Sequence, residues 1–486
     1  MARVNQQIEH EDLAAFLAAG ATCTGQSGFY TSGEGQQVAV DFLHEYIQVN
    51  YRRLYARSLA LGLNHYNRGL VLFNLLAAGA PSDAEQRREE GTLIAAALDA
   101  LPPQRVYRLI RRLRGERVNN RRTRATIKGW VRRRGNTEFD ALKYRAGLLG
   151  AARHAHLPLT GEVGRFLFGG ADAQKRWDSS LLETYRKARY SQEALYQLPM
   201  TVAEGLAARR GVPRKVFLEK IQGRMTAAER LRTQASAARE GAKVELVDLR
   251  RTALTRLAVY LLSLSPRERE ARRAELEGAL AASAARAARA GPALDRTGGT
   301  GKVAAVLDRS WSAGGSRERR RRPLAVALAT SALLRASAPS YRAFWTLPTE
   351  DELLVTRRGQ TDLAGPLLEA LAWGAELVVV VSDGFENDPP GAAAEVLRIW
   401  RERVAPGDGG PVVVHLNPVF DPTRYMPRCL GDGVPALGIR DAEELPELLI
   451  QARFMAGPHD LTALEGHLAR RAAALIARHR ARWKTP

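Results

Sequence analysis

The stretch KVAAVLDRSWS, residues 302–312, decides the fold of the second half of the chain. It opens with a short apolar run, and two similar runs follow, ELVVVVSD at 376–383 and PVVVHLN at 411–417. The stretches between them, 321–336, 362–374 and 392–404, have helical patterns. Continuous apolar strands that alternate with helices are typical of a parallel sheet covered on both faces. The sequence therefore predicts a Rossmann-like α/β domain from residue 296 onward.

Side chains with oxygen atoms follow these strands. Asp308, Ser310 and Ser312 come directly after the first run, Asp383 comes after the run at 376–381, and Thr361 precedes a helix. Because ligands of such sheets bind at the carboxyl ends of the strands, we expect these residues to meet at one edge. Oxygen ligands suit Mg²⁺, or another divalent cation such as Mn²⁺ or Ca²⁺. We expect the two serines to ligate directly and the two aspartates to act partly through water.

This order of residues, D-x-S-x-S followed by Thr and Asp, resembles the von Willebrand A (vWA) fold and its metal-ion-dependent adhesion site (MIDAS). The resemblance implies a metal that accepts one oxygen from an external anion. The alternative is a fold of this kind that no longer binds metal, because Arg309 and Trp311 are bulkier than the residues usual there. The nearby basic run 317–322 could hold a phosphate or be a solvated helix face.

Residues 38–290 have apolar side chains at three- and four-residue steps, which predicts helices. Helical units of about 15–20 residues suit stacked helix pairs of the HEAT kind. Ser265-Pro266-Arg267-Glu268 predicts a capped helix start, and the helix to about Ala290 is expected on the surface or between domains. We therefore expect an all-α domain (1–295, a ring or solenoid), the vWA-like domain (296–458) after the linker at 291–302, and a C-terminal basic helix (459–486).

The positive charge of the chain is concentrated in its first part. The formal net charge is +21, and residues 296–486 hold 25 basic and 22 acidic residues, which leaves 48 and 30 for residues 1–295. Such an asymmetry indicates a polyanionic partner, and RNA is the partner we infer. Solvated helix faces are the alternative interpretation.

The basic excess is densest at 105–134, where thirteen Lys or Arg residues accompany one acid, Glu116. Phosphate contacts give affinity, and aromatic side chains such as Tyr107 and Trp130 can stack on unpaired bases. A shorter basic stretch lies at 209–215. The predicted RNA-binding residues are Arg105, Arg108, Arg111, Arg112, Arg114, Arg117, Arg121, Arg122, Arg124, Lys128, Trp130, Arg132, Arg133 and Arg134.

The whole layout resembles the Ro autoantigen (TROVE) family, which joins a ring of HEAT-like repeats to a vWA domain. The matching segments are GQSGFYT at 25–31, the helix-pair segment at 198–226, GQTD at 359–362 and SDG at 382–384. The resemblance implies a non-catalytic ribonucleoprotein that binds small noncoding Y-type RNA and single-stranded 3′ ends of misfolded RNA. It also implies an exoribonuclease as a protein partner, and a role in RNA quality control, processing or stress response.

Two other functions stay open at this point. A metal-dependent scaffold that recognises an acidic residue of a protein partner would use the same five ligands. A metal-dependent nuclease is disfavoured because the sequence offers no evident general base. No apolar run reaches the roughly 18–20 residues of a membrane span, and the N-terminus does not resemble a signal peptide. With only Cys23 and Cys429, we expect a cytoplasmic protein without membrane contact.

Overall fold

The computed structural model describes residues 2–24, 26, 32–244, 248–290, 301–317, 320–406, 410–419, 430–431, 433–456 and 461–483. The chain divides into two compact units: unit 1 comprises Met1–Val71 and Leu249–Pro486, and unit 2 comprises Leu72–Asp248. The fold is mostly helical with one small parallel sheet, as the sequence predicts at this level. The units do not coincide with the predicted division at residue 295, because segments on both sides of unit 2 group with the sheet.

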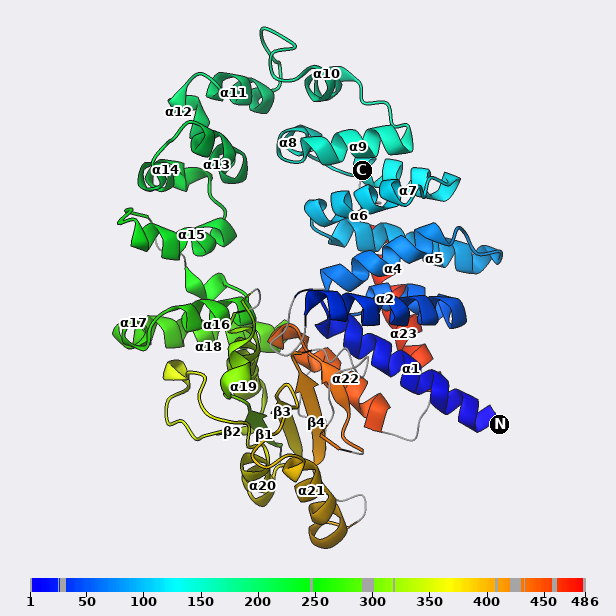
Figure 1. Ribbon diagram of the computed structural model, residues 1–486, viewed down its shortest axis with the longest axis vertical. Coiled ribbons are helices and arrows are strands. Elements are labelled where there is room, and N and C mark those ends of the chain that lie inside the picture. The colour runs from blue at the N-terminus through cyan, green and yellow to red at the C-terminus, as the bar shows by residue number, and fades with distance from the viewer. Residues whose placement is uncertain are drawn as a thin grey trace. The chain divides into compact units, whose positions relative to one another are not determined.

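The sheet of unit 1 has five parallel strands in the order β2-β1-β3-β4-β5 (Figure 1). The three predicted strands are β1 (Lys302–Leu307), β3 (Leu377–Val381) and β4 (Val412–Asn417), and they lie side by side in its centre. The flanking strands are β2 (Ser340–Trp345) and β5 (Ala436–Gly438). β2 has half-buried and exposed positions, which fits an edge strand.

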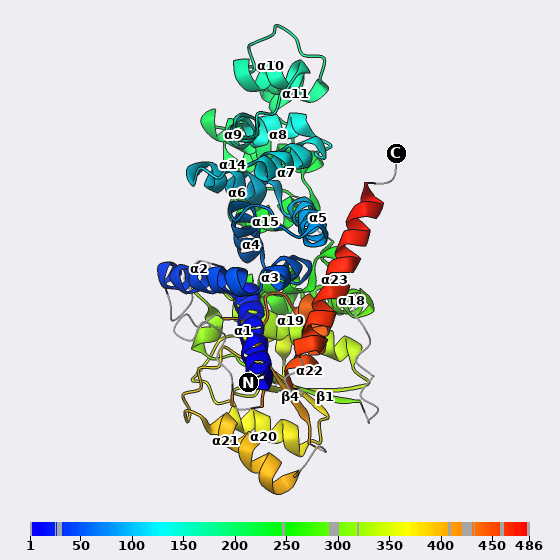
Figure 2. The same cartoon turned by 90° about the vertical axis from the view of Figure 1, so that its right-hand side faces the viewer.

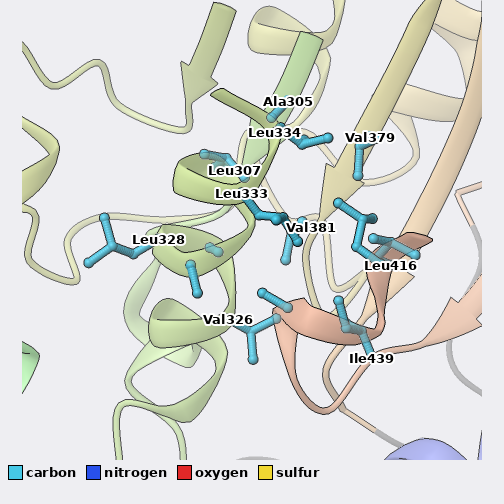
Figure 3. Packing of buried hydrophobic residues seen from close by; sticks show 14 of the residues in the cluster. Ala305, Leu307, Val326, Leu328, Leu333, Leu334, Val379, Val381, Leu416 and Ile439 are labelled. Atoms are coloured by element: carbon cyan, nitrogen blue, oxygen red, sulfur yellow. The ribbon is translucent and has the colours of Figure 1, made fainter. Parts of the chain in front are cut away.

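Both faces of the sheet are buried, which explains the continuous apolar runs. Ala305 and Leu307 face one core cluster, while Ala304 and Val306 face the other. The first cluster includes α19 (Arg322–Ser337) and α22 (Leu445–Ala456), and Figure 3 shows Leu333 of α19 against this face. The second includes α20 (Ala364–Ala372) and α21 (Ala392–Ile399), which continues as a π-helix over Trp400–Val404. Burial of such side chains stabilises by about 1.5–3 kcal/mol each.

The N-terminal segment and the helices after residue 249 are parts of the same unit as the sheet. In α16 (Leu254–Ser263), the Thr255 hydroxyl donates to the Glu443 carboxylate at 2.6 Å and accepts from the Ala442 amide at 2.7 Å. α1 (Ala2–Thr22) packs on β5, where a Cβ at Gly438 would lie 2.3 Å from the Ala18 carbonyl oxygen. Only glycine leaves room for this approach.

The predicted C-terminal helix is α23 (Leu461–Arg482), which packs against α1 and α3 (Arg52–Arg57) (Figure 2). Its charged contacts reach α22, where His467 Nε2 lies 3.0 Å from a Glu447 carboxylate oxygen. The remaining long helices of the N-terminal segment are α2 (Gly33–Asn50) and α4 (His65–Ala77), and α4 runs from unit 1 into unit 2. The C-terminal helix is therefore a part of unit 1.

The predicted helix start at Ser265 is confirmed as a complete capping box with Glu268. The helix that follows differs from the prediction in one way, since it breaks at Arg272 into α17 (Pro266–Ala271) and α18 (Arg273–Ala290). α18 lies on the surface with one buried face: Leu276, Ala279 and Ala284 are buried, and the helix packs against α19. Small alanine side chains allow this close packing.

Unit 2 consists of helices that pack against helices close to them in the chain, such as α6 and α7 against α9, and α8 against α9, α10 and α11. The segment at 198–226 contains the helix pair α13–α14, and α13 starts after Pro199. The linker residues 291–300 and all but Gln26 of the segment 25–31 lie outside the described residues. The helices of unit 2 are α5 (Ala84–Ala100), α6 (Pro103–Gly115), α7 (Arg121–Arg132), α8 (Thr137–Lys143), α9 (Arg145–Ala155), α10 (Gly161–Gly169), α11 (Ser180–Ala188), α12 (Gln192–Leu195), α13 (Met200–Arg209), α14 (Arg214–Ile221) and α15 (Ala227–Arg239).

Candidate functional site

The loop after β1 folds its oxygen-bearing side chains into the protein. Asp308 extends the sheet, since its amide donates to the Val381 carbonyl of β3 at 3.0 Å. One Asp308 carboxylate oxygen accepts the Ser310 amide at 2.8 Å, and the hydroxyls of Ser310 and Ser312 lie 3.0 Å apart. All three side chains are buried. The D-x-S-x-S spacing therefore brings one carboxylate and two hydroxyls together, as predicted.

The Asp308 carboxylate is held by both neighbouring strands. Its second oxygen accepts the Ser382 hydroxyl at 3.0 Å, and the Thr346 hydroxyl lies 3.5 Å from the first. Burial raises the pKa of Asp308, and the hydrogen bonds from Ser310, Ser382 and Thr346 oppose that shift only in part. Sequence reasoning did not identify Ser382 as a supporting residue, although it stands directly before Asp383. Thr346 could have been found as the residue after β2.

The loop that carries Thr361 is attached to the other two loops. The Trp311 amide donates to the Gly359 carbonyl at 3.1 Å, which joins this loop to the one after β1. Thr361 and Asn387 exchange hydrogen bonds: the Thr361 amide donates to the Asn387 side-chain oxygen at 2.8 Å, and the Asn387 amide donates to the Thr361 carbonyl at 3.2 Å. Thr361 is buried, and the three loops thus meet at one edge of the sheet.

Asp383 is positioned by β4 and by its own turn. One of its carboxylate oxygens accepts the Phe385 amide at 3.0 Å. The Asn417 side-chain amide donates to the Asp383 carbonyl at 3.0 Å, and His415 Nε2 lies 3.0 Å from the Ser382 carbonyl oxygen. Asn417 and His415 are buried and were not predicted to support the site. Polar residues inside the apolar run PVVVHLN were the signal that could have revealed them.

The residues at this edge fit a hard divalent cation. We call the set Asp308, Ser310, Ser312, Thr361 and Asp383 the sheet-edge site; it offers two carboxylates and three hydroxyls, all buried. Oxygen donors of this kind are what Mg²⁺ and Ca²⁺ prefer. Among the described residues no three His, Cys, Asp or Glu side chains cluster together, so a cation at this edge would depend on hydroxyl oxygens as well as on the two carboxylates. A buried carboxylate whose pKa is raised by burial is also stabilised by a nearby cation.

The two bulky residues of the first loop, Arg309 and Trp311, differ in their exposure. Arg309 is buried, and its guanidinium donates to the carbonyls of Thr356 (3.1 Å) and Leu347 (3.3 Å). Trp311 is 55% exposed, and the Arg357 guanidinium lies 5.2 Å from its ring centre. Arg309 is therefore a support for the surrounding loops, and Trp311 is the exposed aromatic residue beside the sheet-edge site.

The basic strip at 105–134 separates into exposed and paired residues. We call its seven exposed arginines the basic surface: Arg108, Arg111, Arg112, Arg114, Arg117, Arg121 and Arg132. In the part of the chain that the structure describes, none of the seven forms an ion pair with a carboxylate. Arg105, Arg124 and Lys128 are half-buried, and burial together with the charge of Arg108 lowers the pKa of Arg105. The positive charge of the basic surface is thus not neutralised by neighbouring acids.

Three arginines of the strip instead hold unit 2 together. Arg122 pairs with the buried Glu90 at 2.7 Å. Arg133 binds Asp99 through several hydrogen bonds, the shortest 2.9 Å, and Arg134 binds the buried Asp140 through two hydrogen bonds of 2.8 Å. These guanidinium groups therefore already have carboxylate partners within the protein. In the second basic stretch, Arg214 pairs with Glu204 at 2.7 Å.

The predicted stacking role of Trp130 is wrong. Trp130 is 2% exposed and meets the Tyr107 ring edge-on, with 5.2 Å between the ring centres. Tyr107 is also buried, and its hydroxyl donates to Asp140 at 2.9 Å. The two aromatic residues point to the apolar side of α6 and α7, so the basic surface offers guanidinium groups without these rings. Their burial could have been predicted from the sequence, because helical periodicity places both residues on the apolar side of their helices.

No protein-family model matches this chain, and no curated protein matches it significantly. Among the helices that the structure describes, none has the length and apolar character needed to cross a bilayer.

Proposed function

We propose that this protein is a non-catalytic RNA-binding protein of the Ro type. In this proposal the helices of unit 2 are HEAT-like repeats, and the sheet with its helices is a vWA domain. The RNA is a small structured noncoding RNA, a single-stranded 3′ end of misfolded RNA, or both. The protein would act in RNA quality control, processing or stress response in the cytoplasm, with an exoribonuclease as a partner.

One observation carries the proposal: seven exposed arginines lie on α6, α7 and the loop between them without ion pairs to carboxylates in the described structure. If acidic side chains lay beside these exposed arginines, the two would form ion pairs and the surface would have little positive potential. Here three nearby acids, Glu90, Asp99 and Asp140, are already bound to arginines outside the basic surface. The one acid within the strip, the exposed Glu116, leaves most of the positive charge in excess. The remaining charge favours a polyanion, and guanidinium groups bind phosphate in a forked geometry.

The test measures the salt dependence of RNA binding. A fluorescein-labelled single-stranded RNA and a labelled hairpin are titrated with the full chain at salt concentrations between about 50 and 200 mM. We expect the triple variant Arg108→Glu, Arg111→Glu, Arg121→Glu to bind more weakly. Its slope of log affinity against log salt should fall by about two to three, because each lost phosphate contact removes about 0.7–0.9.

The control has the same change of net charge elsewhere in unit 2. Arg165, Lys175 and Lys220 are exposed and lie outside α6 and α7, so their triple replacement by glutamate should leave most of the affinity. An equal loss in both triple variants would mean that binding follows net charge alone. Failure of both RNAs to bind at the lower salt concentration would overturn the proposal.

The sheet-edge site supports a second candidate function, a metal-dependent scaffold that binds an acidic residue of a protein partner. In both candidates Ser310, Ser312 and Thr361 would hold Mg²⁺ together with the two aspartates, and the cation would supply an electrophile for an external carboxylate. The buried, hydrogen-bonded arrangement of the ligands favours this role. Proteins retained on the immobilised chain in Mg²⁺ should then be released by a chelator and be absent with Asp308→Asn. RNA retention should be unchanged by that substitution.

A further inference from the structure

Unit 1 contains a cavity of about 720 Å³, and its lining includes Gly314, which stands two residues after Ser312. Its walls come from the end of α16, the start of α17, residues 314–317 and 320–321, and the segment 355–357. Figure 1 shows α16, α17 and α19 near one another, and α16 packs on α19. Sites for small molecules and cofactors have volumes of about 300–1,000 Å³. The cavity is therefore large enough for a ligand with a ring and several phosphates.

One wall of the cavity is strongly basic. The residues that line it include Arg269, Arg317, Arg320, Arg321 and Arg357. Among the described residues of the lining, the one carboxylate is that of Glu268, which already accepts the backbone amide of Ser265 at 2.7 Å in the capping box. Five guanidinium groups around one cavity repel one another unless an anion lies between them.

Arg269 is the most constrained of these arginines. It is 2% exposed, and its Nη1 donates to the carbonyls of Leu353 (2.7 Å) and Val355 (3.0 Å). Its Nε is buried and has no hydrogen-bond partner among the described residues. Burial, and then the charge of Arg321, lower the pKa of Arg269. The charge of Asp351 opposes this shift only in part, so a further anion nearby would stabilise this buried cation.

The start of α19 adds to the positive potential. This helix has 16 residues, and its N-cap residue Arg321 makes no capping hydrogen bond with its side chain. Arg321 adopts a left-handed conformation (φ 60°), and its amide donates to the carbonyl of Gly314, another lining residue, at 2.7 Å. Amide groups at the first turn of a helix and the helix dipole both favour anions.

The lining also contains apolar residues, Leu262, Leu264, Leu324 and Val355, which we call its apolar wall. A simple inorganic anion would use the basic wall and leave this apolar surface in water. A ligand that carries both phosphate groups and a flat ring would cover both walls, since apolar surface is stabilised by removal from water. A phosphorylated nucleoside has this combination.

We propose that this cavity binds a phosphorylated nucleoside, with its phosphates on the arginines and the start of α19 and its base on the apolar wall. The ligand is either a free nucleotide or the phosphorylated terminal nucleotide of a nucleic acid. The cavity is separate from the basic surface of α6 and α7, so this inference does not depend on the proposed RNA binding.

Isothermal titration calorimetry of the full chain with ATP, GTP, tripolyphosphate and adenosine tests the proposal. All titrations contain EDTA, because a nucleotide could otherwise bind through a metal at the sheet-edge site. ATP or GTP should bind, and the charge-reversing pair Arg320→Glu, Arg357→Glu should weaken that binding at least about tenfold, the effect of losing one charge-assisted hydrogen bond. Both arginines are exposed, so their replacement should not affect folding.

Two controls separate the cavity from general charge and from the metal site. Arg256→Glu with Arg342→Glu changes the charge of unit 1 equally at exposed positions outside the cavity, and it should leave ATP binding unchanged. Asp308→Asn should also leave it unchanged. An equal loss with the control pair, or binding that survives the cavity pair, would overturn the proposal.

The nature of the ligand is resolved by the same titrations. Tripolyphosphate that binds as tightly as ATP would show that the apolar wall does not recognise a base, which overturns the nucleoside part. A short RNA with a 5′ phosphate, compared with the same RNA carrying a 5′ hydroxyl, distinguishes the two sources. If the chain binds the 5′-phosphorylated RNA more tightly and the variant Arg320→Glu, Arg357→Glu does not, the ligand is the terminal nucleotide of a nucleic acid. If ATP binds but the two RNAs bind equally, the ligand is the free nucleotide. If neither ATP, GTP nor the 5′-phosphorylated RNA binds, the proposal fails.

Discussion

The sheet-edge site and the basic surface differ in what fixes their side chains. At the sheet edge, Asp308 follows β1 directly and Asp383 follows the adjacent parallel strand β3 after one residue, and hydrogen bonds of 2.8–3.2 Å hold the loops. On α6 and α7, arginines with similar sequence surroundings differ in exposure and in their partners, since Arg121 is exposed and Arg122 pairs with a buried glutamate. A functional residue is thus easier to predict where secondary structure fixes its position than where tertiary partners decide its exposure.

The largest expected effect on the free energy of unfolding concerns the arginines of residues 105–134 that pair with carboxylates. Arg122→Met should destabilise the protein by about 3–5 kcal/mol, because the Glu90 carboxylate would remain 1% exposed without that guanidinium. Arg122 also donates to the Gly79 carbonyl at 2.8 Å. Chemical denaturation monitored by circular dichroism measures the change.

Its neighbour provides the matched control. Arg121 is exposed, so Arg121→Met should change the free energy of unfolding by less than about 0.5 kcal/mol. Equal effects of the two substitutions would mean that exposure does not separate structural from available arginines in this strip.

The strip shows what the sequence could and could not predict. The charge excess at 105–134 was evident from composition, but Glu90, Asp99 and Asp140 lie outside the densest part of the strip or at its end, and their pairing depends on how α5, α7 and α8 pack. The burial of Trp130 was predictable, because Ile127, Trp130 and Val131 share the apolar side of α7. The interpretation as a stacking residue gave the basic neighbours more weight than the helical period.

The next effect tests the sheet-edge site as a metal site. Mg²⁺ at about one hundred times its dissociation constant should stabilise the wild-type chain by about 2.7 kcal/mol, if it binds the folded state alone. Asp308→Asn should lose this stabilisation, because the amide retains the shape but removes one of the two charges. Thermal unfolding in Mg²⁺ and in EDTA measures the difference.

Asp362→Asn serves as the control in the same loop region. Asp362 accepts the Gly365 amide at 3.0 Å at the start of α20 and is not one of the five predicted ligands. This variant should keep the response to Mg²⁺. Stabilisation of Asp308→Asn to the same degree as wild type would show that Mg²⁺ acts elsewhere.

The fold of unit 1 was predictable in its centre and not at its periphery. Apolar runs predicted β1, β3 and β4, and the following residues predicted the loops that meet at the sheet edge. The grouping of α1, α16 and α18 with the sheet depends on contacts such as Thr255 with Glu443, which are 188 residues apart. Local periodicity cannot reveal a partner at that distance, so the predicted division at 295 followed the change of pattern along the chain.

A smaller effect tests whether Arg309 supports the site. Arg309→Met keeps most of the aliphatic stem but removes the donors to the Thr356 and Leu347 carbonyls, and should cost about 2 kcal/mol. Because these carbonyls belong to segments near Thr346 and Thr361, the Mg²⁺ response should weaken but persist. Arg358→Met is the control, since Arg358 is exposed and its backbone amide, which the substitution keeps, donates to the Arg309 carbonyl at 2.7 Å. A stronger Mg²⁺ response in Arg309→Met would instead identify Arg309 as an obstacle to the metal.

The smallest expected effect concerns the folding contribution of the basic surface. Replacing Arg108, Arg111 and Arg114 singly by glutamine should change the free energy of unfolding by less than about 0.5 kcal/mol each, because all three are exposed and lack ion pairs in the described structure. Their combined replacement should nevertheless reduce RNA affinity and its salt dependence. An arginine that affects neither property is a solvated side chain, whereas one that affects stability alone belongs with Arg122. Residues that affect RNA binding without affecting stability are the ones that the structure leaves free to meet phosphate.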